Sequence, residues 1–109
     1  MAKGQNNKKI NKEDLKLVVD NKEASLTFHT RVELTNEHIE MFMRGEHEGT
    51  KRYPRFIKNI FKIPGIAGEI FLGRYELSVF KGPRFKWDEI QSKVEAILKR
   101  YVRRKAAQQ

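Results

Sequence analysis

The sequence predicts a two-layer α+β domain, with an antiparallel β-sheet and two helices on one face of it. Short runs in which apolar and polar residues alternate, as in half-buried strands, occur in both halves of the chain. Two other segments, one central and one C-terminal, carry apolar residues at helical spacing. The expected order of elements is β-β-(β)-α-β-β-α, and a length of 109 residues suits one such domain with short extensions.

The folded domain is expected to span residues 13–102. Residues 1–12 are polar and basic and lack the apolar segment of a secretory signal, so they predict a disordered arm. Residues 103–109 begin with two arginines and a lysine and predict a fraying basic tail. No apolar run approaches the roughly 20 residues that cross a bilayer. We therefore expect a cytoplasmic protein with no membrane partner.

The N-terminal part of the domain predicts a β-hairpin. Residues 15–19 mostly alternate between apolar and polar, as a strand does. Residues 20–23 are polar and suit a turn. Residues 25–30 follow with Leu26 and Phe28 on one face, which completes the pair of strands.

Periodicity alone leaves the stretch 35–44 ambiguous. Thr35 could cap an amphipathic helix here. Alternatively, Ile39, Met41 and Met43 would line one face of a strand.

A short helix is predicted after Pro54, which suits a helix start. Its apolar residues recur at helical spacing: Phe56, Ile57, Ile60 and Phe61. The dipeptide Pro64-Gly65 should end it, because proline restricts the residue before it and glycine accepts a positive φ. Two strands are expected next, over residues 69–72 and 75–80.

The last helix is expected from about Lys86 to Arg103. Its apolar residues form one stripe: Ile90, Val94, Ile97, Leu98 and Tyr101. Acidic residues lie in the first turn and basic ones in the last, which complements the helix dipole.

Several short motifs, taken in order, resemble a known family. They are Phe-Lys-Ile-Pro-Gly-Ile at 61–66, Ile-Phe-Leu-Gly at 70–73, Leu-Ser-Val-Phe-Lys at 77–81 and Trp-Asp-Glu-Ile at 87–90. Ala-Ser-Leu-Thr-Phe at 24–28 is similar to that family's first strand. Over about residues 24–102 the chain resembles the N-terminal domain of the Nfu/NifU-like scaffold proteins.

The resemblance implies a strand at 39–43 and a place in iron–sulfur cluster assembly. The family's cluster chemistry belongs to a separate Cys-x-x-Cys domain, which this sequence does not contain. The sequence also departs from the family in the strand-like run at 15–19 and in an apparent insertion at Glu69. The resemblance carries over no catalytic residue, and we expect Phe61 and Trp87 to be core residues.

The residue types give little support to catalysis or metal binding. The chain has no cysteine, which excludes disulfides, thiol nucleophiles and cysteine-ligated clusters on this chain. His29, His38 and His47 lie on separate elements without metal-site spacing. Asp88 and Glu89 are adjacent on a helix, so their side chains point about 100° apart and do not form an acid–base pair. We expect no enzyme, no cofactor and no metal.

The formal net charge of +9 favours an anionic partner. Six residues form the candidate anion- or partner-binding site: Arg52, Arg55 and Lys58 near the central helix, and Arg84, Phe85 and Lys86 before the last one. The nearby aromatics Tyr53 and Trp87 would also suit single-stranded RNA, whose bases stack on such rings.

Two hypotheses for function remain open at this point. The first is a non-catalytic adaptor domain that serves iron–sulfur assembly through a protein partner. The second is a small basic protein that associates with RNA or the ribosome. The fold does not distinguish them, because one fold hosts many functions.

Overall fold

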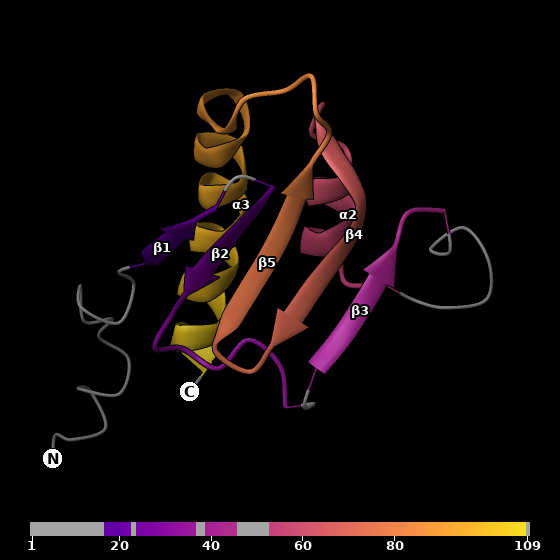
Figure 1. Ribbon diagram of the computed structural model, residues 1–109. Helices are drawn as coiled ribbons and strands as arrows, with labels where there is room; N and C mark the ends of the chain where they lie inside the picture. The colour runs from indigo at the N-terminus through magenta and orange to yellow at the C-terminus, as the bar shows by residue number, and fades with distance from the viewer. Residues whose placement is uncertain (1–16, 23, 37–38, 46–52, 109) are drawn as a thin grey trace, which may run out of the picture.

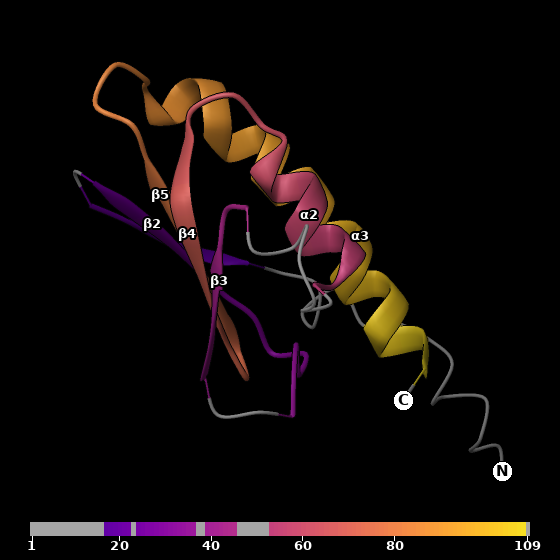
Figure 2. The ribbon, with the colours of Figure 1, turned by 90° about the vertical axis from the view of Figure 1, so that its right-hand side faces the viewer.

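The computed structural model describes residues 17–22, 24–36, 39–45 and 53–108. The described elements are β1 (Val18–Asn21), β2 (Ser25–His29), β3 (Ile39–Met43), α2 (Arg55–Phe61), β4 (Ile66–Gly73), β5 (Glu76–Lys81) and α3 (Trp87–Gln108). The strands form one antiparallel sheet in the order β1-β2-β5-β4-β3, and both helices cover the same face of it (Figures 1 and 2). The predicted two-layer α+β class is confirmed.

The strand alternative for the ambiguous stretch is confirmed, because residues 39–43 form β3. In this strand Phe42 is buried opposite Ile70 of β4, whereas Met41 points to the other face opposite Phe71. Burial of every second side chain is the pattern of a half-buried strand.

The predicted N-terminal hairpin is also present, with a shifted first strand. β1 continues to Asn21 and so includes part of the predicted turn, because Asp20 and Asn21 pair with Thr27 and Leu26 of β2. Residues 15–16, with which that strand was expected to begin, lie outside the described residues.

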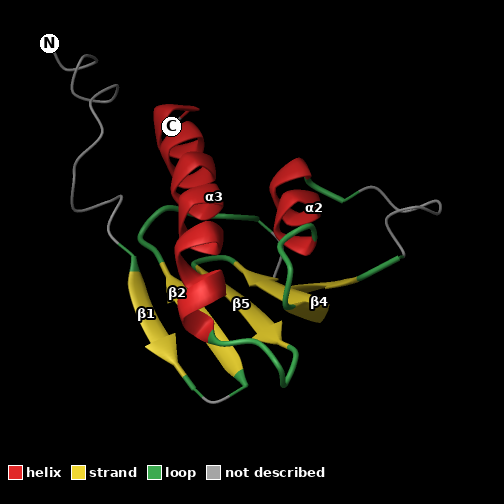
Figure 3. Ribbon diagram, turned by 90° about the horizontal axis from the view of Figure 1, so that it is seen from above, coloured by secondary structure: helices red, strands yellow, loops and turns green. Residues whose placement is uncertain are grey.

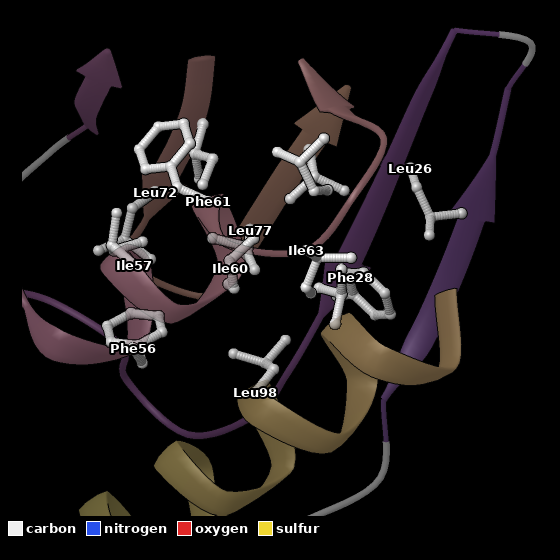
Figure 4. Packing of buried hydrophobic residues seen from close by; sticks show 14 of the residues in the cluster. Leu26, Phe28, Phe56, Ile57, Ile60, Phe61, Ile63, Leu72, Leu77 and Leu98 are labelled. Carbon is white, nitrogen blue, oxygen red and sulfur yellow. The ribbon is translucent and has the colours of Figure 1, made fainter. Parts of the chain in front are cut away.

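The core lies between the sheet and the helices (Figure 4). From the sheet, the buried residues are Leu26 and Phe28 of β2, Phe42 of β3, Ile66, Ile70 and Leu72 of β4, and Leu77 and Val79 of β5. From α2 they are Phe56, Ile57, Ile60 and Phe61, and from α3 they are Trp87, Ile90, Val94, Leu98 and Val102. Phe61 and Trp87 are thus core residues, as expected.

Helix α3 differs from its prediction in face and in length. Val102 is fully buried, whereas Ile97 and Tyr101 are only partly buried beside the core. The helix continues through Arg103 to Gln108, and Ala106 packs against the core in this last part. This contact explains why residues 103–108 are helical where the sequence predicts a fraying tail.

The turn after α2 depends on Gly65, as predicted. Gly65 has φ +101°, and a Cβ added to it would lie 2.8 Å from the Phe85 ring. Its carbonyl accepts a hydrogen bond of 2.9 Å from the Gly82 N–H. Arg44, at the end of β3, donates to the carbonyls of Phe61 and Ile66 at 2.8 and 2.7 Å and so ties this turn to the sheet edge.

Glu69 lies in an irregular part of β4. Ile66 pairs with Lys81 and Ile70 with Val79, so β4 advances four residues while β5 advances two. A bulge of this kind accommodates extra residues without breaking the sheet. The insertion seen in the sequence therefore lies within the strand.

Replacing Gly65 by alanine should destabilise the fold by about 1–3 kcal/mol, because a side chain at positive φ is strained and would also meet Phe85. Gly68 provides the control, since a Cβ there meets nothing within 4 Å. Gly68→Ala should change the free energy of unfolding by less than about 1 kcal/mol. Urea denaturation measures both, and equal effects would contradict the assigned role of Gly65.

Leu98→Ala should cost about 2–5 kcal/mol, because the side chain is fully buried. Ile97→Ala should cost only about 1–2 kcal/mol, because this residue lies at the edge of the core. The comparison by urea denaturation tests the orientation of α3. A larger loss for Ile97 than for Leu98 would show that the helix is rotated.

Candidate functional site

The structure does not bring the six predicted binding residues into one cluster. Arg55 is the first residue of α2, and Lys58 follows one turn later. Phe85 instead lies against Gly65, beyond the other end of α2, and Arg84 and Lys86 flank it in the turn before α3. Figure 2 shows this turn and the end of α2 at the same end of the molecule. Arg52 lies outside the described residues.

Two of the three aromatic residues near these basic residues, Tyr53 and Trp87, are not available to stack on a base. Tyr53 is buried, and its hydroxyl accepts from the Met43 N–H at 2.9 Å and donates to the Met43 carbonyl at 3.1 Å. Trp87 is also buried, and its indole N–H donates to the Lys22 carbonyl at 3.1 Å. Of the three aromatics, only Phe85 is exposed. Base stacking on Tyr53 or Trp87 is therefore excluded in this conformation.

A basic hollow of about 120 Å³ lies between α2 and α3. We call it the arginine hollow, because Arg55 of α2 and Arg100 and Arg104 of α3 line it. Its other lining residues are Pro54, Phe56, Asn59, Ile97 and Tyr101. Figure 3 shows that the two helices lie next to each other over the sheet.

Two stacked aromatic rings form part of the hollow's lining. The Phe56 and Tyr101 ring centroids are 3.8 Å apart, with an angle of 18° between the rings. The Tyr101 hydroxyl donates to the Leu34 carbonyl at 3.0 Å. Burial raises the pKa of Tyr101, and Glu40 raises it further, whereas Arg104 lowers it. The phenol is therefore neutral near pH 7 and holds α3 against the segment before β3.

Sequence reasoning missed two of the three arginines. In the sequence, Arg100 and Arg104 are among the basic residues that complement the dipole in the last turn of the predicted C-terminal helix, and nothing more is expected of them. Their spacing of i and i+4, which places them on one face of a helix, was the available signal. That Arg55 would face them required knowledge of how α2 packs on α3, which the sequence does not provide.

The face of the sheet away from the helices carries a second candidate surface. Ile39 and Met41 of β3 are 72% and 47% exposed. On the same face, Met41 pairs with Phe71 of β4, and Phe71 meets Phe80 of β5 edge to face at 5.6 Å. We call these four residues the apolar sheet patch. No described residue covers Ile39 or Met41, so hydrophobic surface is available here.

The charge differs between the two faces. Among the five described strands, Lys81 is the only Lys or Arg. Its ammonium lies 5.9 Å from the centre of the Trp87 ring, on the helix side. The arginine hollow is on that same side. The apolar sheet patch thus shares its face with no strand cation, and Glu69 lies opposite Met43 there.

Strand β3 forms one edge of the sheet. The Arg44 N–H donates to the Gly68 carbonyl of β4 at 2.8 Å, so the main-chain groups of Met43 are turned to the free side. The Tyr53 hydroxyl bonds both of those Met43 groups. The edge therefore remains open only at Ile39 and Met41 within the described residues.

The described residues contain no group of three or more His, Asp or Glu side chains placed to hold a metal ion. His29 is exposed at the end of β2, and His38 and His47 lie outside the described residues. Neither of the two described helices is long and apolar enough to cross a membrane.

Comparisons with known proteins agree with this fold. Protein SAV1430 from Staphylococcus aureus, seen in its crystal structure, is 19% identical, with a TM-score of 0.60 over 76% of this chain and 94% of that one. A NifU-like protein from Saccharomyces cerevisiae is 16% identical, with a TM-score of 0.63 over 78% of this chain and 74% of that one. At these identities the similarity shows the fold alone. No curated protein sequence is significantly similar to the chain.

The match to a protein family is more direct evidence of relationship than these structural similarities. The family described as scaffold protein Nfu/NifU N terminal matches residues 16–105, which include every described strand, α2, and α3 up to residue 105. The earlier resemblance is therefore confirmed over nearly the whole folded region, and the chain belongs to the Nfu/NifU N-terminal domain family.

Proposed function

We propose that this chain is a non-catalytic adaptor domain that serves iron–sulfur cluster assembly through a protein partner. The observation that carries the proposal is the family match over residues 16–105 in a chain that has no cysteine. Iron–sulfur clusters are held by thiolates, usually four of them. The partner therefore supplies the cluster ligands, and this domain contributes recognition.

The apolar sheet patch is the surface that we assign to this partner. A two-layer fold leaves one sheet face uncovered, and here that face carries exposed Ile39 and Met41 beside Phe71 and Phe80. Exposed apolar clusters of this kind are typical of protein interaction sites. With no strand cation on this face, the patch suits a protein surface with an apolar centre better than a nucleic acid.

The turn before α3 is proposed as an additional contact for an acidic part of the partner. It presents Arg84, Phe85 and Lys86 close together, away from Arg55 and Lys58. Arg52 lies outside the described residues, so we include it in the proposal only because it is close to Arg55 in the sequence. We also propose a cytoplasmic location, consistent with the absence of cysteine.

The RNA or ribosome hypothesis has less support. It rests on the net charge of +9, because Tyr53 and Trp87 are buried and cannot stack on bases. Charge alone gives binding that is non-specific and weakens steeply with salt. The adaptor hypothesis is favoured because it also accounts for the family match.

Anaerobic reconstitution with iron and sulfide should leave the isolated chain without a stable cluster, because it offers no thiolate ligand. The measurement is the visible absorption spectrum together with bound iron and sulfide after desalting. A Cys-x-x-Cys domain of a NifU-like scaffold, treated in parallel, is the positive control. A stable chromophore with iron and sulfide in whole-number proportion to this chain would contradict the proposal.

The adaptor proposal also predicts binding to a partner through the apolar sheet patch. The probe is a cluster-loaded Cys-x-x-Cys domain of a NifU-like scaffold, titrated calorimetrically. Ile39→Ser/Met41→Ser should weaken binding by at least about tenfold, the effect expected for buried interface residues. Both residues are exposed in the free domain, so folding should be retained, and thermal unfolding checks this.

Val18→Ser is the matched control, because Val18 is 61% exposed on β1, at the opposite edge of the sheet. It should leave the affinity unchanged. Arg84→Gln/Lys86→Gln tests the additional contact in the same titration. Equal loss of affinity in the Val18 and Ile39/Met41 variants would contradict the assigned surface, and absence of any binding by the wild type would contradict this class of partner.

A further inference from the structure

We infer that the arginine hollow between α2 and α3 is a binding site for the carboxylate of an acidic protein segment. Arg55 approaches it from one helix, and Arg100 and Arg104 from the other. The helices α2 and α3, whose residues line this site, lie on one side of the sheet (Figure 2), and the apolar sheet patch is on the other face. The inference is therefore independent of the surface assigned to the cluster-bearing partner.

The three arginines lack an anionic partner within the described part of the chain. The ion pairs found there join Arg74 to Glu33 and Lys99 to Glu95. Glu40, the carboxylate that acts on Tyr101, accepts a hydrogen bond of 2.8 Å from the Thr35 hydroxyl instead.

Like charges that line one hollow repel each other, although water screens these three arginines because each is exposed. Arg100 and Arg104 are four residues apart on one helix, a spacing at which like charges destabilise the helix. Arg55 adds a third positive charge from the facing helix. A bound anion would be attracted to all three arginines and would offset the repulsion between them. The site therefore favours a negatively charged ligand.

The size and lining of the hollow favour a carboxylate on an aliphatic stem. A volume of about 120 Å³ admits one small group. Guanidinium groups bind the two oxygens of a carboxylate in a fork, with geometry that a lysine cannot provide. Ile97 and the Phe56–Tyr101 stack offer apolar surface on which the methylene groups of a glutamate would pack.

The same lining disfavours a nucleic acid. Phe56 is only 5% exposed, and its ring covers one face of the Tyr101 ring at 3.8 Å. The Phe56 ring therefore offers no free face on which a base would stack, and one face of the Tyr101 ring is already covered. A phosphate could meet the arginines, but of the other lining residues only Asn59 and Tyr101 carry a side-chain group that could bond the rest of the nucleotide.

The test uses the whole chain and a short capped peptide with two adjacent glutamates, titrated by NMR. Wild type should bind one peptide per chain, with amide shifts centred on α2 and the second half of α3. Arg100→Gln/Arg104→Gln should weaken binding by at least about tenfold, the loss expected when charge-assisted hydrogen bonds are removed. The same peptide with glutamines in place of glutamates should not bind.

Lys99→Gln/Arg103→Gln is the matched control, because it removes the same charge from the same helix. Both residues are exposed and neither lines the hollow. It should weaken binding by less than about threefold, through long-range charge alone. Similar losses in the two double variants would overturn the site and indicate diffuse attraction.

Two further probes separate the possible sources of the anion. Inorganic phosphate and a short single-stranded RNA are titrated under the same conditions. Binding of either one that depends on Arg100 and Arg104, with no binding of the acidic peptide, would overturn the assignment to a protein segment. Absence of binding by all three probes would overturn the site altogether. Peptide binding that depends on these two arginines supports it, whatever the outcome of the partner titration.

Discussion

The packing of α3 on the inner face of the sheet is the contact on which the rest of the structure depends. Ile90, Val94, Leu98 and Val102 recur every fourth residue and are all fully buried. They share one hydrophobic cluster with Leu26 and Phe28 of β2 and with Leu77 and Val79 of β5, so this one helix covers strands of both the N-terminal and the C-terminal hairpin. Hydrophobic burial of this kind provides most of the stability of a small domain.

This arrangement also determines where binding surfaces can be. With α2 and α3 on one face, the opposite face of the sheet is left without a covering layer, and the apolar sheet patch lies there. The two helices lie next to each other, and side chains from both of them line the arginine hollow. Both candidate surfaces are therefore consequences of the two-layer architecture, and their charges differ because the Lys and Arg residues lie mainly outside the strands.

The fold was largely predictable because its signals are local. Alternation identified β5, Pro64-Gly65 located the end of α2, and the motifs from Phe61 to Ile90 supplied the family and, with it, the strand at residues 39–43. The site was less predictable because it depends on contacts between distant residues. Ile97 has helical spacing like that of Leu98, and only the packing of α2 decides that it lines a hollow. Arg55 and Arg84 are similar in sequence context, but α2 separates them.

The hydroxyl of Tyr53 has a consequence for how the protein behaves at high concentration. An exposed edge strand is a template on which further chains can add, and natural proteins protect such edges. Here one phenol occupies both main-chain groups of Met43, so among the described residues of β3 a foreign strand would find only Ile39 and Met41 to pair with. Two residues give too few main-chain hydrogen bonds to start aggregation at this edge. Strand β3 can therefore keep exposed apolar side chains for partner binding without promoting fibre growth.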